Sequence, residues 1–509
     1  MEFILSLIFI IILVILTYTI VTKNNPKKQS ILALPGPRKL PIIGNLHQLV
    51  SRTTLPHRRL SDLSSTFGPV MHLTLGEVPT IILSSADAAK EAMKTHDSAL
   101  CSRPRLRMAE VVFYGCSDIA LAPYSEYWRH VRKIATLELF TGARVHSFRM
   151  VRVEEVMELI KCLSMKVGNV VNLSQMIFDL SFTITLRIAM NKKGKDEREF
   201  RTLFSDMTEI ASGFSLGDLY PSIKLIHSIT GMKRKLEDLV KRADKLMNPI
   251  IEEHISNMQR GENVVQDLID ILLTFHKGDC DSNRSTSDFS VTVDNIKAIV
   301  LELFGAGSET SSTTIEWAIA ELLKNKGAME KATDEVRHVL RGKEMFDDTS
   351  CLVELKYLKN VIKETLRLHP PFPLLVPRIA MERCQINGHE IAPNTRVFIN
   401  AWAIGRDAEN WKDPEKFNPE RFEGSSVDYK GNHFELIPFG AGRRMCPGIG
   451  LGVATIELAL AMLLYHFDWN LPRGTTHEDL DMGETFGAVA RRKNELRVIP
   501  IAYSPPIFK

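Results

Sequence analysis

The loop at residues 438–448, with the sequence PFGAGRRMCPG, constrains this chain more than any other stretch. Two glycines before Cys446 allow a tight turn in which backbone N–H groups point at the sulfur. Pro447 suits the first position of a helix, and a long apolar run comes after it. Cys446 is then expected at a helix N-terminus beside Arg443 and Arg444, where the helix dipole and the cations favour thiolate over thiol. The pattern predicts a cysteine that is a nucleophile or a metal ligand.

Two other interpretations of the loop are weaker. A nucleotide-binding loop needs a β-rich run before it, in a βαβ unit with a later acidic residue, and the sequence does not provide these. A structural cysteine that is merely buried is inert and has no need of the glycines and arginines that surround Cys446.

The loop also carries a family pattern. Phe439, Gly442, Arg444, Cys446 and Gly448 fill F-x-x-G-x-R-x-C-x-G, which resembles the haem-binding loop of the cytochrome P450 family. In that family the cysteine is the proximal thiolate ligand of the haem iron, and the arginine bonds a haem propionate. Thiolate ligation pushes electron density onto the iron and favours O–O cleavage. The resemblance implies heme b as cofactor, with Cys446 as metal ligand and with Arg444 and Phe439 at the haem.

Residues 292–324 form the longest stretch with helical periodicity, and its centre is unusual. Gly305 and Gly307 each cost about 1 kcal/mol in a helix interior, so a compensating role is expected. Small residues let a flat cofactor lie against the backbone, and Thr310 can bond the carbonyl four residues back and open the helix.

This centre resembles the family motif A/G-G-x-D/E-T, which crosses the distal face of the haem. The resemblance places Ala306 and Gly307 at the cofactor. It makes Glu309 and Thr310 the catalytic pair that organises water and delivers protons to dioxygen. In the structural alternative, Thr310 only caps a carbonyl and Glu309 pairs with a surface cation.

Two more acids belong to the same stretch. Glu302 and Glu316 each lie seven residues from Glu309. For both we expect solvation or pairing at the surface.

Trp128 and Arg132 are four residues apart and therefore share one helix face. An indole N–H and a guanidinium on one face can both donate to a carboxylate; the alternative is an aromatic ring packed beside a surface arginine. This W-x-x-x-R resembles the family's helix that contacts the haem propionates. By the same resemblance, Arg103 and Arg378 are further cofactor-binding candidates.

Glu364 and Arg367 are three apart on a predicted helix. Most such pairs are surface ion pairs of little energetic value. In the family they join a third residue, Arg421 here, in a buried charge network near the haem. The role that the resemblance implies for them is structural rather than catalytic.

An apolar run over residues 3–21 is the candidate membrane anchor. At about 1.5 Å per residue, a helix of this length nearly spans the ~30 Å hydrocarbon core. A cleaved signal peptide should begin with positive charge and end in small residues, but Glu2 precedes the run and lysines come after it. We therefore expect a retained single-pass anchor over residues 1–22, with the catalytic domain cytosolic by the positive-inside rule.

The rest of the chain divides into a linker and one domain. Residues 23–45 are basic and then proline-rich, resembling the stiff hinge of microsomal members of the family. Residues 46–509 form the catalytic domain. Short β-branched runs at 70–75 and 80–83 predict a hairpin. Most of the domain after this hairpin has helical periodicity, and the polar stretch 277–290 is expected to be a loop.

The implied fold is mainly α. It is the helical triangular prism of the family with small β-sheets, and the haem lies between the long central helix and the cysteine loop. The expected N-terminal transmembrane helix precedes it.

Composition limits the partners. Lys and Arg number 64 and Asp and Glu 61, so the net charge of +3 gives no case for nucleic acid. Seven scattered cysteines without a C-x-x-C pair fit a reducing compartment.

The resemblance spans residues 35–500 and is closest to plant microsomal members that oxidise terpenoids and indole alkaloids. It implies a monooxygenase of the endoplasmic reticulum membrane that hydroxylates or epoxidises a lipophilic specialised metabolite. Its electrons would come from NADPH through NADPH-cytochrome P450 reductase, and O2 would be the co-substrate. By resemblance, the substrate contacts lie at residues 106–122, 303–306, 374–376 and 486–489, which are mainly apolar.

Two other classes stay open. A haem-thiolate isomerase or dehydratase rearranges a peroxide and needs neither reductase nor proton delivery, and the Glu309–Thr310 pair speaks against it. A haem-binding protein without turnover is disfavoured by the complete set of motifs.

Overall fold

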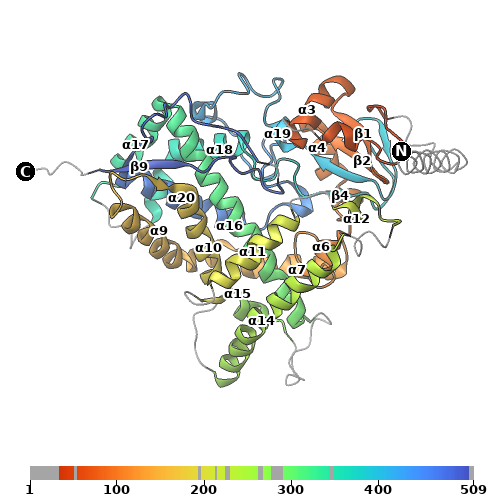
Figure 1. Cartoon of the computed structure of the whole chain (residues 1–509), viewed down its shortest axis with the longest axis horizontal. Helices are drawn as coiled ribbons and strands as arrows, with labels where there is room; N and C mark the ends of the chain where they lie inside the picture. The colour runs from red at the N-terminus through yellow and green to blue at the C-terminus, as the bar shows by residue number, and fades with distance from the viewer. Residues whose placement is uncertain are drawn as a thin grey trace, which may run out of the picture.

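A computed structural model of the chain describes residues 34–50, 54–192, 197–211, 215–223, 230–261, 267–276, 290–342, 349–485 and 487–503. The outline is triangular, with β1, β2, α3 and α19 at one corner, α17 and β9 at a second, and α14 at the third (Figure 1). The mainly helical architecture with small sheets is the one that the sequence predicted. The candidate anchor at residues 1–22 and most of the polar stretch 277–290 lie outside the described residues.

The helices before the centre of the chain are α2 (Leu46–Leu49), α3 (Pro56–Phe67), α4 (Ala86–Lys90), α5 (Asp97–Leu100), α6 (Arg107–Val112), α7 (Glu126–Ile134), α8 (Gly142–Ser147), α9 (Arg149–Ser164), α10 (Leu173–Met190), α11 (Glu197–Ala211), α12 (Leu216–Leu219) and α14 (Met232–Arg260). The later helices are α15 (Leu268–Leu273), α16 (Val293–Lys324), α17 (Lys326–Val339), α18 (Lys356–Leu368), α19 (Ala401–Ile404) and α20 (Ile449–His466). Single π turns are η2 (Glu91–Thr95) and η3 (Ala135–Leu139), and 3₁₀ turns are η4 (Thr349–Glu354), η5 (Pro419–Phe422) and η6 (Gly442–Arg444).

The largest sheet has the strand order β1-β2-β7-β4, formed by β1 (Val70–Leu75), β2 (Val78–Leu83), β7 (Arg396–Ile399) and β4 (Arg378–Ile379). Strands β1 and β2 form the predicted antiparallel hairpin, with Val70 opposite Leu83, and β7 runs parallel to β2. The smaller sheets are β3-β9-β8, from β3 (Val171–Asn172), β9 (Arg497–Ala502) and β8 (Phe467–Asn470), and β5-β6, from β5 (Cys384–Ile386) and β6 (His389–Ile391).

The first described residues lie along β1. His72 N donates to Pro35 O at 2.8 Å, and the Asn45 side chain accepts from Thr74 N and donates to Pro37 O. Residues 34–45 therefore lie along the sheet, with a turn at 41–43.

Helix α16 runs through the middle of the molecule and packs on α10, α20 and α18. Its first turn is fixed by a capping box in which Thr292 and Asn295 accept each other's backbone N–H. The helix is buried on nearly all sides, which explains its apolar composition. It provides the rigid element on which the cavity and its polar residues are built.

The two glycines of α16 lie where other helices approach most closely. A Cβ at Gly307 would stand 3.1 Å from Thr185 Oγ1 on α10, and one at Gly305 would stand 3.3 Å from the Phe204 ring on α11. Close helix packing therefore explains why both residues are glycine. The sequence did not predict this reason.

Two described helices are long and apolar enough to cross a membrane, namely α10 and α20. Both are largely buried, and both pack against α16. Their apolar composition is explained by these positions in the core.

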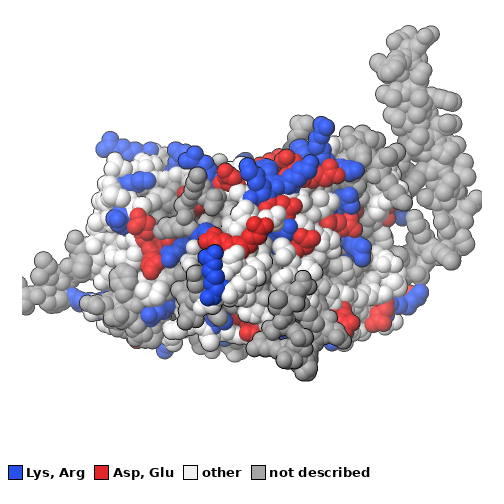
Figure 2. Space-filling view, turned by 90° about the horizontal axis from the view of Figure 1, so that it is seen from below, with Lys and Arg blue, Asp and Glu red and all other residues white. Residues whose placement is uncertain are grey.

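The surface carries both signs of charge. On the face seen from below, basic and acidic side chains are intermixed, in keeping with the nearly balanced composition (Figure 2).

An aromatic cluster joins α10 and α11 to α16. The Phe182 ring, fully buried, lies 6.2 Å from that of Phe204 and 5.8 Å from that of Phe304. We expect Phe182→Ala to lower the free energy of unfolding by about 3–5 kcal/mol because it leaves a cavity among rings that cannot collapse fully. Denaturant titration followed by circular dichroism measures this loss. The control Leu137→Ala, at a side chain more than half exposed, should change it by less than about 0.5 kcal/mol.

Candidate active site

One internal cavity of about 860 Å³ collects most of the residues that the sequence singled out. It is lined by the middle of α16, by the cysteine loop and by segments of α7, α10, α11 and the sheet region. The predicted site residues on its wall are Arg103, Trp128, Arg132, Ala306, Gly307, Glu309, Thr310, Arg378, Phe439, Arg444 and Cys446. The expected cofactor and proton-delivery residues therefore face a common space.

The cysteine loop is shaped by its glycines. Gly442 has φ +69°, and a Cβ there would lie 2.2 Å from Met93 O, so no other residue fits without moving the backbone. The next residue, Arg443, donates its backbone N–H to Asp97 Oδ2 at 2.9 Å. Cys446 N donates to Phe439 O at 3.0 Å, which closes the loop.

The Cys446 side chain is open to the cavity but surrounded by protein. This burial raises the pKa of the Cys446 thiol, and the N–H of Gly448 and the charge of Arg132 act against the rise. Arg443 pairs with Asp97 and Arg444 donates to backbone carbonyls, so the cation whose charge acts on Cys446 is Arg132 and not the two arginines that the sequence pointed to. Helix α20 begins at Ile449, so Pro447 precedes the helix and does not occupy its first position.

The expected propionate donors are anchored to carbonyl oxygens. Trp128 Nε1 donates to Ile119 O at 2.9 Å, and Arg132 Nη2 donates to Met445 O at 2.6 Å, beside the cysteine. The Arg444 guanidinium stacks 3.9 Å from the Trp128 ring. Burial lowers the pKa of Arg444 to about 9.

Arg103 and Arg378 complete this basic region. Arg103 donates to Ala120 O and Val376 O at 2.8 and 2.6 Å, and Arg378 pairs with Asp97 at 2.8 Å. Burial lowers the pKa of Arg103 well below its ordinary value. A region with several buried cations favours binding of an anionic group.

Glu309 and Thr310 make specific contacts on α16. Thr310 Oγ1 donates to Ala306 O at 2.6 Å, as the i−4 bonding predicted. The Glu309 carboxylate pairs with Arg491, from the C-terminal part of the chain. Burial raises the pKa of Glu309, and Arg491 lowers it. The structural alternative expects the same two contacts.

Comparison with known proteins identifies the family. The cytochrome P450 family model matches residues 34–499. The chain belongs to the cytochrome P450 family.

Relatives agree with the match. Cytochrome P450 71D11 of Lotus japonicus is 48% identical over 96% of this chain and 98% of its own length. Desmethyl-deoxy-podophyllotoxin synthase of Sinopodophyllum hexandrum is 47% identical over 98% and 97%, and melianol synthase of Citrus sinensis 46% over 92% and 91%. A zebra fish cytochrome P450 structure with progesterone has a TM-score of 0.75 at 26% identity, covering 88% of this chain and all of that one. The chain is thus a cytochrome P450 monooxygenase with the P450 fold.

The cavity fits the family's haem. A metal ion deprotonates a coordinating thiol outright, so the raised pKa of Cys446 does not oppose iron binding. The buried arginines beside it suit the carboxylates of the porphyrin.

Glu302 lies on the cavity wall and Glu316 is buried, so their prediction as surface residues was wrong. Glu302 accepts the N–H of Ile119 at 2.5 Å, and burial, followed by the nearby Asp118, raises its pKa. Glu316 accepts from Ser174 at 2.5 Å and pairs with Arg492. The prediction failed because α16 has hardly any solvent-facing side.

Asp118 is a cavity residue that the sequence did not single out. It is fully buried; one oxygen accepts the N–H of Leu121 at 2.7 Å, and burial raises its pKa. No local signal in the sequence marks Asp118, because its burial depends on the surrounding fold.

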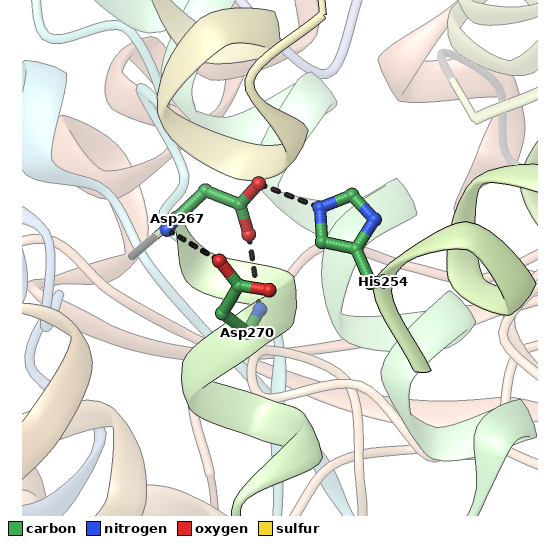
Figure 3. A group of neighbouring side chains, drawn as sticks. All are labelled: His254, Asp267 and Asp270. Carbon is green, nitrogen blue, oxygen red and sulfur yellow. Dashed lines mark hydrogen bonds and ion pairs between the residues drawn. The ribbon is translucent and has the colours of Figure 1, made fainter. Parts of the chain in front are cut away.

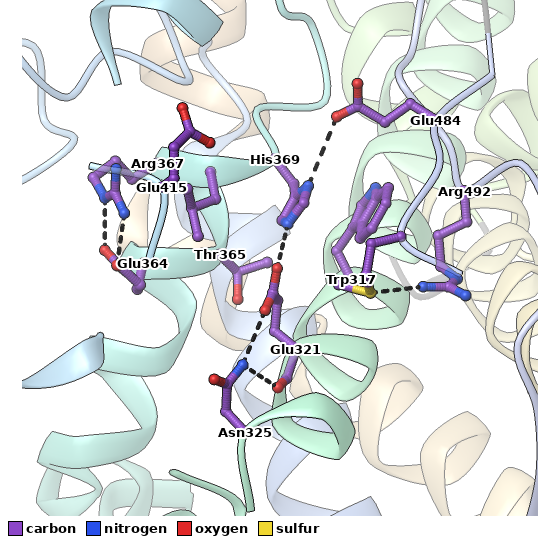
Figure 4. Close-up of polar contacts among 12 residues, drawn as sticks. Trp317, Glu321, Asn325, Glu364, Thr365, Arg367, His369, Glu415, Glu484 and Arg492 are labelled. Atoms are coloured by element: carbon purple, nitrogen blue, oxygen red, sulfur yellow. Dashed lines mark hydrogen bonds and ion pairs between the residues drawn. The ribbon is translucent and has the colours of Figure 1, made fainter. Parts of the chain in front are cut away.

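Glu364, Arg367 and Arg421 form the buried network that the family resemblance predicted. Arg367 Nε and Nη2 each donate to Glu364 at 2.7 Å, with both side chains fully buried (Figure 4). Arg421 Nε adds a third bond to Glu364 at 2.9 Å. These residues stand apart from the cavity wall, which agrees with a structural role.

A second buried chain of ionisable side chains, also in Figure 4, lies between α16 and the C-terminal segment. His369 stacks on Trp317, with ring centroids 3.9 Å apart, and its Nε2 lies 2.7 Å from Glu321. On the other side of His369, Glu484 pairs with His57 at 3.0 Å. Burial alone would raise the pKa of Glu484, but His369, His57 and a nearby arginine hold it well below its ordinary value.

Away from the cavity, His254, Asp267 and Asp270 form a compact cluster (Figure 3). His254 Nε2 lies 2.8 Å from Asp267, and Asp267 and Asp270 accept each other's N–H in the capping box that begins α15. Burial lowers the pKa of His254, but the bond to Asp267 outweighs it and raises the pKa to about 9. The cluster satisfies its own hydrogen bonds and ties α14 to α15.

Residues from all four expected substrate segments line the cavity, including Leu106, Leu303, Leu375 and Val489, although Phe486 lies outside the described residues. Sequence reasoning missed the wall formed by α10 and α11, which includes Ile184, Phe204 and Met207. Nothing in their local sequence distinguishes them from ordinary core residues.

Glu364→Gln should abolish most of the stability that the buried network provides. The neutral amide keeps the shape but leaves Arg367 and Arg421 without their carboxylate, for which a loss of about 3–5 kcal/mol is typical. Unfolding titrations measure this value. Glu158→Gln, which breaks a surface pair with Lys161, is the matched control and should cost under about 1 kcal/mol. Equal effects in the two variants would contradict the network's role.

The pair of His254 and Asp267 predicts that the stability of the protein depends on pH. Since the folded pKa of about 9 exceeds the ordinary 6.5, the stabilisation is complete below pH 6.5 and is lost as the pH rises through 9. The difference in unfolding midpoint between wild type and His254→Gln should therefore shrink between pH 6 and pH 9.5. A difference that stays constant across this range would show that His254 is not charged in the folded protein.

Proposed function

We propose that the chain hydroxylates or epoxidises a lipophilic plant specialised metabolite, a terpenoid or an indole alkaloid. O2 is the co-substrate, and NADPH-cytochrome P450 reductase supplies the electrons. One substrate, one O2 and one NADPH with a proton yield the oxygenated product, water and NADP⁺. The observation that carries the proposal is that Cys446 and the Glu309–Thr310 pair face one cavity.

The cofactor site is assigned residue by residue. Cys446 would hold the iron of heme b, and Phe439, Ala306 and Gly307 would lie at the porphyrin. The donors proposed for the propionates are Arg103, Trp128, Arg132, Arg378 and Arg444. Bound haem supplies the redox chemistry, and thiolate ligation favours O–O cleavage.

The protein's own part is to bind, exclude water and supply protons. Apolar residues such as Leu303, Leu375 and Val489 keep bulk water from the substrate. Because Thr310 Oγ1 donates to Ala306 O, its lone pairs remain available to hold a water in the cavity. Glu309 is the neighbouring group that can take a proton from solvent and pass it on through that water.

The substrate class rests on the cavity wall. The four substrate segments are mainly apolar, and the buried acids beside them, Asp118 and Glu302, are engaged by backbone N–H groups of residues 119–121. Two relatives, named after melianol and after desmethyl-deoxy-podophyllotoxin, support a specialised-metabolite substrate.

The location is part of the proposal. An anchor over residues 1–22 would hold the protein in the endoplasmic reticulum membrane as a single-pass protein, with a linker at 23–45 and the catalytic domain at 46–509 in the cytosol. The apolar run at 3–21 and the lysines after it support this arrangement.

The second candidate is a haem-thiolate isomerase or dehydratase. The bonds from Thr310 to Ala306 and from Glu309 to Arg491 are compatible with it, because a purely structural pair would also make them. Such an enzyme would turn over without reductase and without consuming NADPH. Product formation that requires neither would therefore replace the monooxygenase proposal.

Thr310→Ala tests proton delivery. Haem content and substrate binding should stay nearly intact, while the ratio of product to NADPH consumed falls and hydrogen peroxide rises. Loss of an acid–base contribution sets the scale at about a hundredfold. Thr310→Ser, which keeps the hydroxyl, should retain much more of the ratio. Equal ratios in wild type, Ala and Ser would exclude a role of the hydroxyl.

A further inference from the structure

The segment after Glu484 is fastened along one face of α16. Glu484 and Arg492 form an antiparallel β-bridge, so the described residues 484–485 and 487–492 belong to a narrow hairpin. Trp317 Nε1 donates to Ala490 O at 3.1 Å, and Arg492 pairs with Glu316 at 3.5 Å. Residues 487–491 of this hairpin also line the cavity.

Arg491 occupies the point where this hairpin meets the proton-delivery pair. Its guanidinium donates to the Glu309 carboxylate, which is adjacent in sequence to Thr310. The Arg491 side chain is 42% exposed, whereas the Glu309 side chain is only 9% exposed. The ion pair therefore joins a partly exposed cation to a nearly buried acid on the cavity wall.

Among the described residues, Arg491 supplies the charge that acts on Glu309. Arg491, from the hairpin, is the charged group whose influence on Glu309 is resolved. Further along α16, Glu316 is held by Arg492 and Ser174. Arg491 is thus the cation on which the ionisation of Glu309 depends.

We propose that Arg491 is a positioning residue for oxygen activation, which holds the Glu309 carboxylate ionised and at the solvent end of the route to Thr310. This rests on the proposed proton delivery by Glu309 and Thr310. Glu309 can take a proton from solvent water only as a carboxylate, and the cation keeps it in that form. Because an arginine stays protonated, Arg491 itself transfers no proton.

The test is a double-mutant cycle with Glu309→Gln, Arg491→Gln and the double variant, measured as product formed per NADPH consumed with reductase present. If Arg491 acts through Glu309, the double variant should be no worse than Glu309→Gln alone. Lys493→Gln removes an exposed charge two residues along the same segment and should leave the ratio unchanged. The carbon monoxide difference band of each variant reports whether the haem–thiolate protein is folded.

The pH profile of this ratio is a second test, because loss of a purely structural residue would not shift it. Loss of the cation raises the pKa of Glu309, so the pH at which the ratio is half-maximal should move up by about one unit in Arg491→Gln. Arg491→Lys keeps a cation and should stay near the wild-type profile, and it serves as the second variant if the Gln variant does not fold.

Independent, multiplicative losses in the double variant, or an unmoved pH profile in Arg491→Gln, would overturn the inference. A lower ratio of product to NADPH consumed in Arg491→Lys, with no shift of its pH profile, would also overturn it. If Thr310→Ala leaves the ratio unchanged, the proposed proton delivery fails first. A lowered ratio in Thr310→Ala with no effect at Arg491 would reject only the role of Arg491.

Discussion

The buried carboxylate of Asp97 is the interaction on which the cysteine loop depends. It accepts from Arg378 Nη1 at 2.8 Å and from the backbone N–H of Arg443 at 2.9 Å. It thereby joins β4, the first turn of α5 and the loop that carries Cys446. A Cβ at Gly442 would meet both Asp97 and the Met93 carbonyl, so the loop has room for one conformation.

Much of this molecule could be predicted from short-range patterns, because the responsible contacts are local. The N-cap of α16, the bond from Thr310 to Ala306 and the shared helix of Trp128 and Arg132 depend on spacings of three or four residues. The family resemblance added the buried Glu364 network, which spacing alone would have assigned to the surface. Partners far apart in sequence were not predictable: Arg491 lies 182 residues from Glu309, and Asp97 lies 346 from Arg443.

The errors share a physical cause. Glu302 and Glu316 were expected at the surface because charged residues are usually solvated. In this fold α16 is enclosed, so each acid is compensated by donors from another segment, Ile119 for the first and Ser174 for the second. The cation that acts on Cys446 was missed for a similar reason, because Arg132 lies more than 300 residues away in the sequence.

The glycines of α16 limit how the substrate range of such an enzyme can change in evolution. At Gly307 a methyl group would press on Thr185, and at Gly305 it would press on Phe204, so this side of the helix cannot gain bulk without displacing its neighbours. The walls made by the segments around Leu106, Leu375 and Val489 are under no such restriction from helix packing. New substrate ranges should therefore arise by changes in these loops while Gly305 and Gly307 stay unchanged, and a library for directed evolution is best concentrated in the loops.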